Sequence, residues 1–313
     1  MQSRVHWPEG RRFAFTVFDD TDHTTLANGP QVYELLTDLG MRTTKSVWPI
    51  SGRIPPTVGG ATCEDPDYLA WVTSLRDKGF EIAFHNATFS TSDRAQALRG
   101  MARFRQLFGT FPNAHANHAD CRDGIYWGPS RMTGVNRIAY LLLTKGRTRG
   151  QDGGTNLASA SFWGDSCRAH VTYVRNFVFT DINTLKVCPQ MPYHDLSRAY
   201  VNQWFASSEG PDRRSFCRTI AEENQDRLES EGGACIMYTH FGAPDFLERG
   251  RLHAGFVKLM TRLAAKNGWF VPVSTLLDHI RRLRGEHVIT PRERNRLERR
   301  WLLEKAFLTR GTT

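Results

Sequence analysis

The run Phe15-Thr-Val-Phe-Asp-Asp-Thr-Asp22 decides how the rest of this sequence is interpreted. It begins as a short apolar segment, which is typical of a buried strand, and three of its last four residues are carboxylates. Carboxylates this close repel one another unless a positive group lies between them. The stretch therefore predicts either a strand that delivers acidic side chains to a metal site or a strand that ends in a solvated loop.

The composition is that of an ordinary globular protein. The chain has 313 residues, 40% hydrophobic and 23% charged, and this length accommodates one large α/β domain. No run approaches 18 apolar residues, so no transmembrane helix is expected, and the first residues show no apolar segment of a secretory signal. The six cysteines form no Cys-x-x-Cys pair, which favours reduced thiols. We therefore expect a cytoplasmic protein.

Positive charge is concentrated near the C-terminal end. Residues 281–313 contain ten Arg or Lys and four Asp or Glu, a net charge of +6 out of the +9 of the chain. We expect a basic helical tail at 286–313, with apolar residues such as Trp301 and Leu303 at helical spacing. The tail is interpreted either as a helix docking its apolar stripe on the domain or as a segment that binds an anionic surface or a protein partner. Nucleic acid is not expected, because basic and aromatic residues are not interleaved.

Strand and helix patterns alternate along most of the chain. Strands are predicted at 13–18, 42–48 and 80–84, and helices bounded by Pro or Gly follow them. An irregular insertion is expected at about 141–210, with a β-hairpin around Asp181. A helix at 214–230 and a strand at 234–239 come next. This order predicts a parallel α/β sheet or barrel within one domain at 10–285.

Polar residues follow several of these strands: Asp19 and Asp20, His85, His115 and His118, and His240. A single Asp or His at such a position is more often a helix cap, or a core side chain whose hydrogen bonds are satisfied, than a metal ligand. In parallel α/β folds, however, the carboxyl ends of the strands lie together and carry the chemistry. Four such ends in one sheet therefore predict an active site.

The succession of FTVFDDTD, GFEIAFHNAT, a histidine-containing segment, Trp-Gly-Asp and CIMYTHFG resembles the polysaccharide deacetylases with NodB homology. The resemblance covers about residues 10–280. It implies a distorted (β/α) barrel of about seven repeats and a metal-dependent carbohydrate deacetylase acting on linear amide bonds. Residue by residue, it implies Asp19 as the general base, Asp20 and His85 as metal ligands, and His240 as the general acid.

The resemblance also implies a divalent metal, because a cation polarises the acyl carbonyl and activates water. Mixed Asp and His ligands suit zinc, with cobalt or nickel as alternatives. The implied substrate is an oligo- or polysaccharide carrying N-acetyl or O-acetyl groups.

Two positions depart from the family pattern. Phe89 occupies the place of the family's second ligand histidine. The third ligand is then expected from His118, with His115 or Asp22 as alternatives. The Arg-Pro pair that steadies the base in the family is not found, and Asn117-His118 or Arg122 occupies roughly that region.

Further residues are expected to support the site or to bind substrate. Asn86 and Thr88 belong to the second motif, and Trp163 and Asp165 loosely resemble a motif that orients the catalytic histidine and shapes the pocket. Aromatic residues that could stack on sugar rings are Tyr126, Trp127, Trp163 and Trp204.

Two other functions stay open. A catalytically altered relative would bind a glycan with little metal and no turnover. A metal hydrolase acting on a non-sugar amide is also compatible with the fold, since one fold serves many chemistries. It would bind metal and show esterase activity without releasing product from N-acetylated oligosaccharides.

Overall fold

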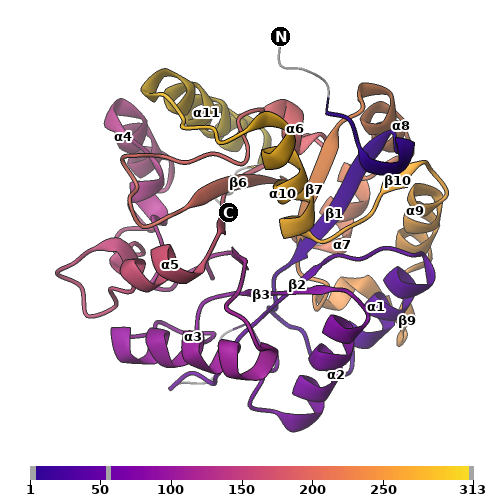
Figure 1. The fold of residues 1–313 in the computed structure, drawn as a ribbon, viewed down its shortest axis with the longest axis horizontal. Coiled ribbons are helices and arrows are strands. Elements are labelled where there is room, and N and C mark those ends of the chain that lie inside the picture. The colour runs from indigo at the N-terminus through magenta and orange to yellow at the C-terminus, as the bar shows by residue number, and fades with distance from the viewer. Residues whose placement is uncertain (1–4, 54–57, 310–313) are drawn as a thin grey trace.

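A computed structural model of the chain describes residues 5–53 and 58–309. Its centre is a closed barrel of seven parallel strands with helices around it (Figure 1). The predicted α/β barrel is therefore confirmed. The barrel strands are β1 (Phe13–Asp19), β2 (Thr44–Val47), β3 (Glu81–Phe84), β4 (Ala114–His115), β5 (Tyr173–Phe179), β6 (Gln203–Glu209) and β7 (Ala234–Thr239).

Strand order follows chain order, and β1 closes the ring by pairing with β7 from Ala14↔Ala234 to Asp19↔Thr239. The short strand β10 (Gly268–Trp269) adds a further parallel pairing to β1. Outside the barrel, β8 (Leu247–Glu248) and β9 (Arg251–Leu252) form a small antiparallel pair.

Eleven α-helices are assigned in the described residues: α1 (Gly29–Asp38), α2 (Pro66–Asp77), α3 (Arg94–Phe108), α4 (Gly134–Leu143), α5 (Gly164–His170), α6 (Thr184–Val187), α7 (Arg213–Thr219), α8 (Glu222–Glu231), α9 (Ala254–Ala264), α10 (Val273–Arg284) and α11 (Pro291–Glu304). The single helix expected at 214–230 is in fact two, α7 and α8, because the chain leaves helical geometry around Ile220 and Ala221. None of the described helices is long and apolar enough to span a bilayer.

The core explains why β1 reads as a continuous apolar run. All seven residues of β1 are buried, as are all those of β5, β6 and β7. Parallel strands covered on one face by helices and on the other by the barrel interior are apolar on both faces rather than alternating. Polar side chains within these strands are few, and the buried hydroxyls of Thr16 in β1 and Ser207 in β6 have no hydrogen-bond partner among the described residues.

The β-hairpin expected around Asp181 is wrong. β5 and β6 pair in parallel, with Tyr173 opposite Gln203 and Phe179 opposite Ser208. The chain turns at Asp181, forms α6 with Asn183 as its N-terminal cap, and returns before β6. An apolar run does not specify the direction of its partner strand, so the sequence pattern fitted both arrangements. The range 141–210, expected to be an insertion, contains two barrel strands.

The basic C-terminal segment contains the predicted helix, α11, which packs on the domain. Its Trp301 is fully buried and stacks on Tyr140 of α4, with ring centroids 6.0 Å apart. Its Glu298 is buried as well and accepts hydrogen bonds from Thr133 and Asn136. Residues 310–313 of the predicted tail lie outside the described residues.

Candidate metal centre and active site

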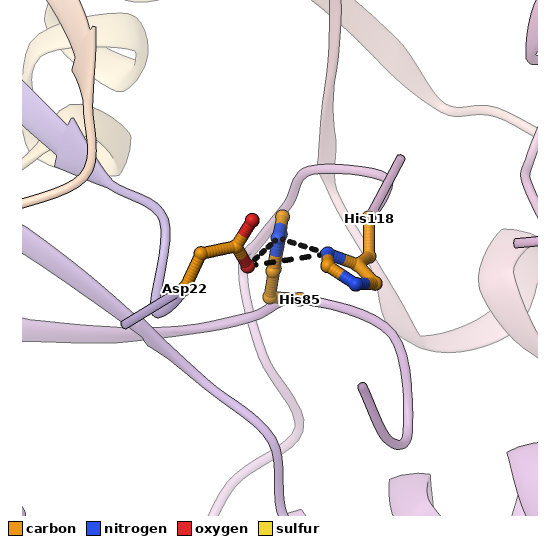
Figure 2. Close-up of side chains that lie close together, drawn as sticks. All are labelled: Asp22, His85 and His118. Atoms are coloured by element: carbon orange, nitrogen blue, oxygen red, sulfur yellow. Dashed lines mark hydrogen bonds and ion pairs between the residues drawn. The ribbon is translucent and has the colours of Figure 1, made fainter. Parts of the chain in front are cut away.

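Three side chains that could hold a metal ion meet at the carboxyl ends of three barrel strands: Asp22 after β1, His85 after β3 and His118 after β4 (Figure 2). Asp22 Oδ1 lies 3.3 Å from His85 Nε2 and 3.2 Å from His118 Nδ1. The two histidine nitrogens are 3.2 Å apart. All three residues are buried.

The tautomer of His85 is set by its backbone partner. His85 Nδ1 donates to the carbonyl oxygen of Ala116 at 3.0 Å, so the neutral ring presents the lone pair of Nε2 to Asp22 and His118. Asp22 Oδ1 is buried and has no hydrogen-bond partner within the described residues. Three lone-pair-bearing atoms at such short distances repel one another unless a proton or a cation lies among them. This donor set fits a divalent metal of the zinc class.

The pKa shifts of the residues in the cluster also favour a positive charge between them. Burial alone would raise the pKa of the Asp22 carboxyl, but His118 and His85 together hold it well below the ordinary 3.8. Burial likewise opposes charge on His118, and Asp22 nevertheless raises the pKa of that ring. The carboxylate is thus an anion that requires positive charge beside it.

Asp20 is bound to an arginine. Arg175 of β5 donates to both Asp20 oxygens, at 2.9 and 2.5 Å, and both side chains are almost fully buried. Burial would raise the pKa of Asp20, but the Arg175 guanidinium outweighs it and lowers that pKa. The nearest approach to the cluster is 3.9 Å, between Asp20 Oδ1 and His85 Nδ1. Asp20, expected as a metal ligand, therefore lies beside the cluster of ligand atoms and not within it.

Asp19, expected as the general base, is fully buried at the end of β1. Its Oδ1 accepts the backbone N–H of Phe241 at 2.8 Å, and its Oδ2 accepts from Tyr33 at 2.9 Å and from Lys45 at 3.0 Å. Burial raises the pKa of this carboxyl in spite of Lys45. With both oxygens engaged in the interior, Asp19 holds the segment that begins after His240 in place.

His240 follows β7, as the sequence predicts, and faces the cluster. Its Nδ1 donates to the carbonyl oxygen of Pro211 at 2.8 Å. Its Nε2 lies 3.3 Å from the Tyr238 hydroxyl and 3.6 Å from Asp22 Oδ2. Because Nδ1 is the donor to Pro211, Nε2 of the neutral ring accepts from the Tyr238 hydroxyl, on the side of Asp22.

A small cavity joins these groups. Its volume of about 30 Å³ is room for roughly two water molecules. The lining residues are Asp20, Asp22, His85, Asn117, Ala119, Trp127, Arg175, Val178, Tyr238 and His240. Asp20, Asp22, His85 and His240 therefore border one water-sized space, whereas His118 contacts Asp22 and His85 without lining it.

Phe89, which stands where the family has a histidine, packs against an aromatic neighbour of the cluster. Its ring packs edge-on against Trp48, with centroids 5.5 Å apart. Trp48 in turn lies edge-on to His118 at 5.3 Å and beside His85 at 6.2 Å. His115, an alternative ligand, points elsewhere: it donates to Phe84, and burial lowers its pKa to about 3.

The polar residues expected around the site mainly position its loops. Asn86 accepts from the His118 backbone N–H through Oδ1 and donates to Asp123. Asn117 bonds both backbone groups of Ile125. Thr88 closes a tight turn with Ser90.

Several expected substrate contacts lie elsewhere. Trp163 is buried and donates to the Asp123 carbonyl oxygen. Asp165 forms a surface ion pair with Arg94, and Arg122 is exposed. Of the aromatic candidates, Tyr126 stacks on Tyr200 at a centroid distance of 6.3 Å, Trp204 is buried, and Trp127 alone lines the cavity.

Sequence reasoning missed Arg175, Lys45 and Trp48. The signal for the two cations was present: each interrupts a short strand that is otherwise uncharged. Charged residues are rarely fully buried unless they are paired. A lone cation inside a predicted buried strand therefore indicates a carboxylate partner in the core.

Comparison with solved structures supports the fold. A crystal structure named "putative polysaccharide deacetylase" from Mycobacterium smegmatis matches with a TM-score of 0.51 and 14% identity, over 92% of this chain and 97% of that one. Puue allantoinase matches with a TM-score of 0.49 and 12% identity, over 91% and 95% of the two chains. A Pseudomonas aeruginosa PAO1 protein named "probable Polysaccharide deacetylase" has a TM-score of 0.49 and 12% identity, over 90% and 95%.

At this level of identity the likeness establishes a shared barrel fold. No family model and no curated protein matches the sequence.

Proposed function

We propose that this chain is a metal-dependent hydrolase that removes acetyl groups from an N-acetylated saccharide. The observation that carries the proposal is the meeting of Asp22, His85 and His118 around one point, next to a cavity that Asp20, Asp22, His85 and His240 line. The deacetylase name attached to the structural neighbour of the same fold agrees with it.

Asp22, His85 and His118 would hold the cation, with zinc proposed from the one-carboxylate, two-imidazole donor set. When bound, such a cation lowers the pKa of a water and polarises the substrate carbonyl. In this proposal His118 is the second histidine ligand, because position 89, where the resemblance implies a histidine, is a phenylalanine. Asp22, and not Asp20, is the carboxylate ligand.

Asp20 is then the group suited to accept the proton of the attacking water. Arg175 fixes its orientation through two hydrogen bonds and keeps it anionic. Arg175 of β5 also takes the role of the family's arginine that steadies the base, for which no Arg-Pro motif is found in the sequence. The two hydrogen bonds from Arg175 make the Asp20 carboxylate less basic. Asp20 would therefore promote proton transfer through its position beside the attacking water and not through a high pKa.

His240 is suited to protonate the leaving amine. Its Nδ1–H is engaged by Pro211, so a proton gained in the cycle resides on Nε2, which faces Asp22. Donation from Nε2 would release the amine and return the ring to its neutral form. Asp19 supports this step through the backbone of Phe241, immediately after His240.

The proposal is tested by acetate release from N-acetylglucosamine oligomers, with chelator-treated protein before and after addition of Zn²⁺, Co²⁺ or Ni²⁺. We expect metal-restored release that is lost in His240→Ala. Absence of acetate with every metal, from a protein that binds zinc, would reject the saccharide substrate.

A hydrolase acting on a small non-sugar amide is the second candidate. The narrowness of the cavity favours it, because ligand pockets are usually about 300–1,000 Å³ and this one is about 30 Å³. Metal-dependent cleavage of a small activated ester, without acetate release from the oligomers, would select this candidate.

A further inference from the structure

We propose that α4 and α11 form a docking surface for an anionic lipid bilayer. The inference does not depend on the catalytic assignment. It starts from an unusual distribution of exposed apolar side chains. Of the twelve large apolar side chains exposed in the described residues, six lie on α4 or on α11 and the turn after it: Val135, Ile138, Leu142, Leu143, Leu303 and Phe307.

The apolar face of α4 is regular. Val135, Ile138 and Leu142 are spaced so that they fall on one side of the helix, and they are 66%, 60% and 74% exposed. The opposite side is buried, with Asn136 bonded to Asn295 and Tyr140 stacked on Trp301. The exposed leucines and isoleucine are therefore not needed for packing against the domain.

The neighbouring helix supplies positive charge. Arg292, Arg296, Arg299 and Arg300 are exposed on the outer side of α11, and none has an ion-pair partner among residues 5–53 and 58–309. With Asn295 and Leu303 they line one shallow groove. Asn295 bonds Asn136, and Figure 1 shows α4 and α11 together at the periphery of the barrel.

The acidic residues of α11 do not offset this charge. Glu298 is buried under Thr133 and Asn136, Glu293 forms the capping box with Thr290, and Glu304 accepts from the Thr180 backbone. The segment after α4 adds the exposed Lys145, Arg147 and Arg149. Among the described residues, no carboxylate forms an ion pair with the α11 arginines of this surface, which therefore carries an excess of exposed positive charge.

A helix face with exposed apolar residues beside a row of arginines is the pattern of interfacial membrane helices. The apolar side chains would enter the acyl boundary while the guanidinium groups bind lipid phosphates. A protein partner of this chemistry would need a matching acidic rim around an apolar centre. The bilayer is favoured because the exposed apolar side chains of α4 and the arginines of α11 match the acyl boundary and the phosphates of an anionic lipid surface.

Co-sedimentation with vesicles tests the proposal on the full-length chain. We expect binding to vesicles of phosphatidylglycerol mixed with phosphatidylcholine, much weaker binding to phosphatidylcholine alone, and a marked loss as salt is raised. Arg296→Glu/Arg299→Glu should weaken binding at least about tenfold, since each basic residue near an anionic surface is worth about fivefold. Arg99→Glu/Arg105→Glu, two exposed substitutions on α3 with the same change of net charge, is the matched control.

The apolar contribution is tested separately. Ile138→Ser/Leu142→Ser should weaken binding to the anionic vesicles at unchanged net charge, whereas Leu157→Ser, at an equally exposed loop position, should not. Circular dichroism confirms that the variants are folded. Failure of the folded wild type to sediment with anionic vesicles would overturn the proposal. So would light scattering that shows a dimer broken by Ile138→Ser/Leu142→Ser, because the face would then be an interface between copies.

Discussion

His118 Nδ1 lies 3.2 Å from His85 Nε2, although the two residues are 33 positions apart in the chain. The contact is possible because β3 and β4 are neighbours in the barrel and both histidines follow their strands. It gives the cluster a second imidazole even though Phe89 occupies the place where the sequence resemblance has one.

Substitutions at positions 118 and 89 test which of the two residues occupies a ligand position. His118→Ala should reduce zinc affinity by more than the roughly 10–100-fold typical of outer-shell changes, because it removes a proposed ligand. Phe89→His should change affinity little, since position 89 faces Trp48. Metal content by mass spectrometry of protein purified without affinity nickel measures both. Higher affinity in Phe89→His than in the wild type would show that the wild-type site lacks a ligand.

Substitutions of Asp20 and Asp22, which are separated by Thr21, should have different effects. Asp22→Asn should lose the metal, while Asp20→Asn should keep it and lower kcat by about 10²–10⁴, the range expected for removing a general base. Titration calorimetry with Zn²⁺ and acetate release measure the two effects. Metal loss in Asp20→Asn, with retention in Asp22→Asn, would restore Asp20 as the ligand.

Asp19→Asn should lower the free energy of unfolding substantially while lowering kcat only slightly. The substitution leaves the buried Lys45 without its anionic partner, which typically costs about 3–5 kcal/mol. The amide oxygen can still accept from Phe241, so kcat per folded molecule should fall less than about tenfold. Urea unfolding and kinetics on the folded fraction measure the two quantities.

A compensating change provides the control. Asp19→Asn/Lys45→Met removes the stranded charge and should recover much of the lost free energy of unfolding. A loss of kcat as large as that of Asp20→Asn, in a fully folded Asp19→Asn protein, would return the role of general base to Asp19.

Asp195 ties the loop before β6 to α11 and makes stability depend on pH. Burial would raise the pKa of Asp195, but Arg198, Ser197 and Arg294 outweigh it and lower that pKa below 3.8. A lowered folded-state pKa stabilises the protein above the unfolded value, and this stabilisation is lost as pH falls through the folded value. Asp195→Asn should therefore cost about 3 kcal/mol near neutral pH.

The difference between wild type and Asp195→Asn should shrink steadily below about pH 4, because protonation neutralises the wild-type carboxyl too. Urea denaturation at a series of pH values measures it. A constant difference across that range would show that the charge of Asp195 plays no part.

The C-terminal helix should prove necessary for folding. Truncation after residue 285 removes the buried Leu297, Trp301 and Leu302, and Trp301→Ala alone should cost about 3–5 kcal/mol. Thermal unfolding of Trp301→Ala, compared with Leu303→Ala at an exposed position of the same helix, measures the effect. A truncated protein with wild-type stability would support an independent tail.

The sequence by itself determined the barrel and the neighbourhood of the site. Runs such as FTVFD and ACIMYT, each followed by helix signals, are enough to predict parallel strands, because parallel strands buried on both faces are apolar throughout. The same rule that places chemistry at strand ends predicted that Asp19, Asp20, His85 and His240 would lie together, with His118 favoured over Asp22 as a third ligand. These properties are local or follow from strand order.

The tertiary structure decided which side chain has which partner. Asp19, Asp20 and Asp22 are alike in the sequence, but β1 directs Asp19 to Lys45, Asp20 to Arg175 of β5, and Asp22 to the two histidines. Arg175 is 155 residues from Asp20. The sequence also left undetermined whether β6 runs parallel to β5 and whether α11 packs on the domain. Successive side chains at a strand end point in different directions, and only the closed barrel fixes what each one meets.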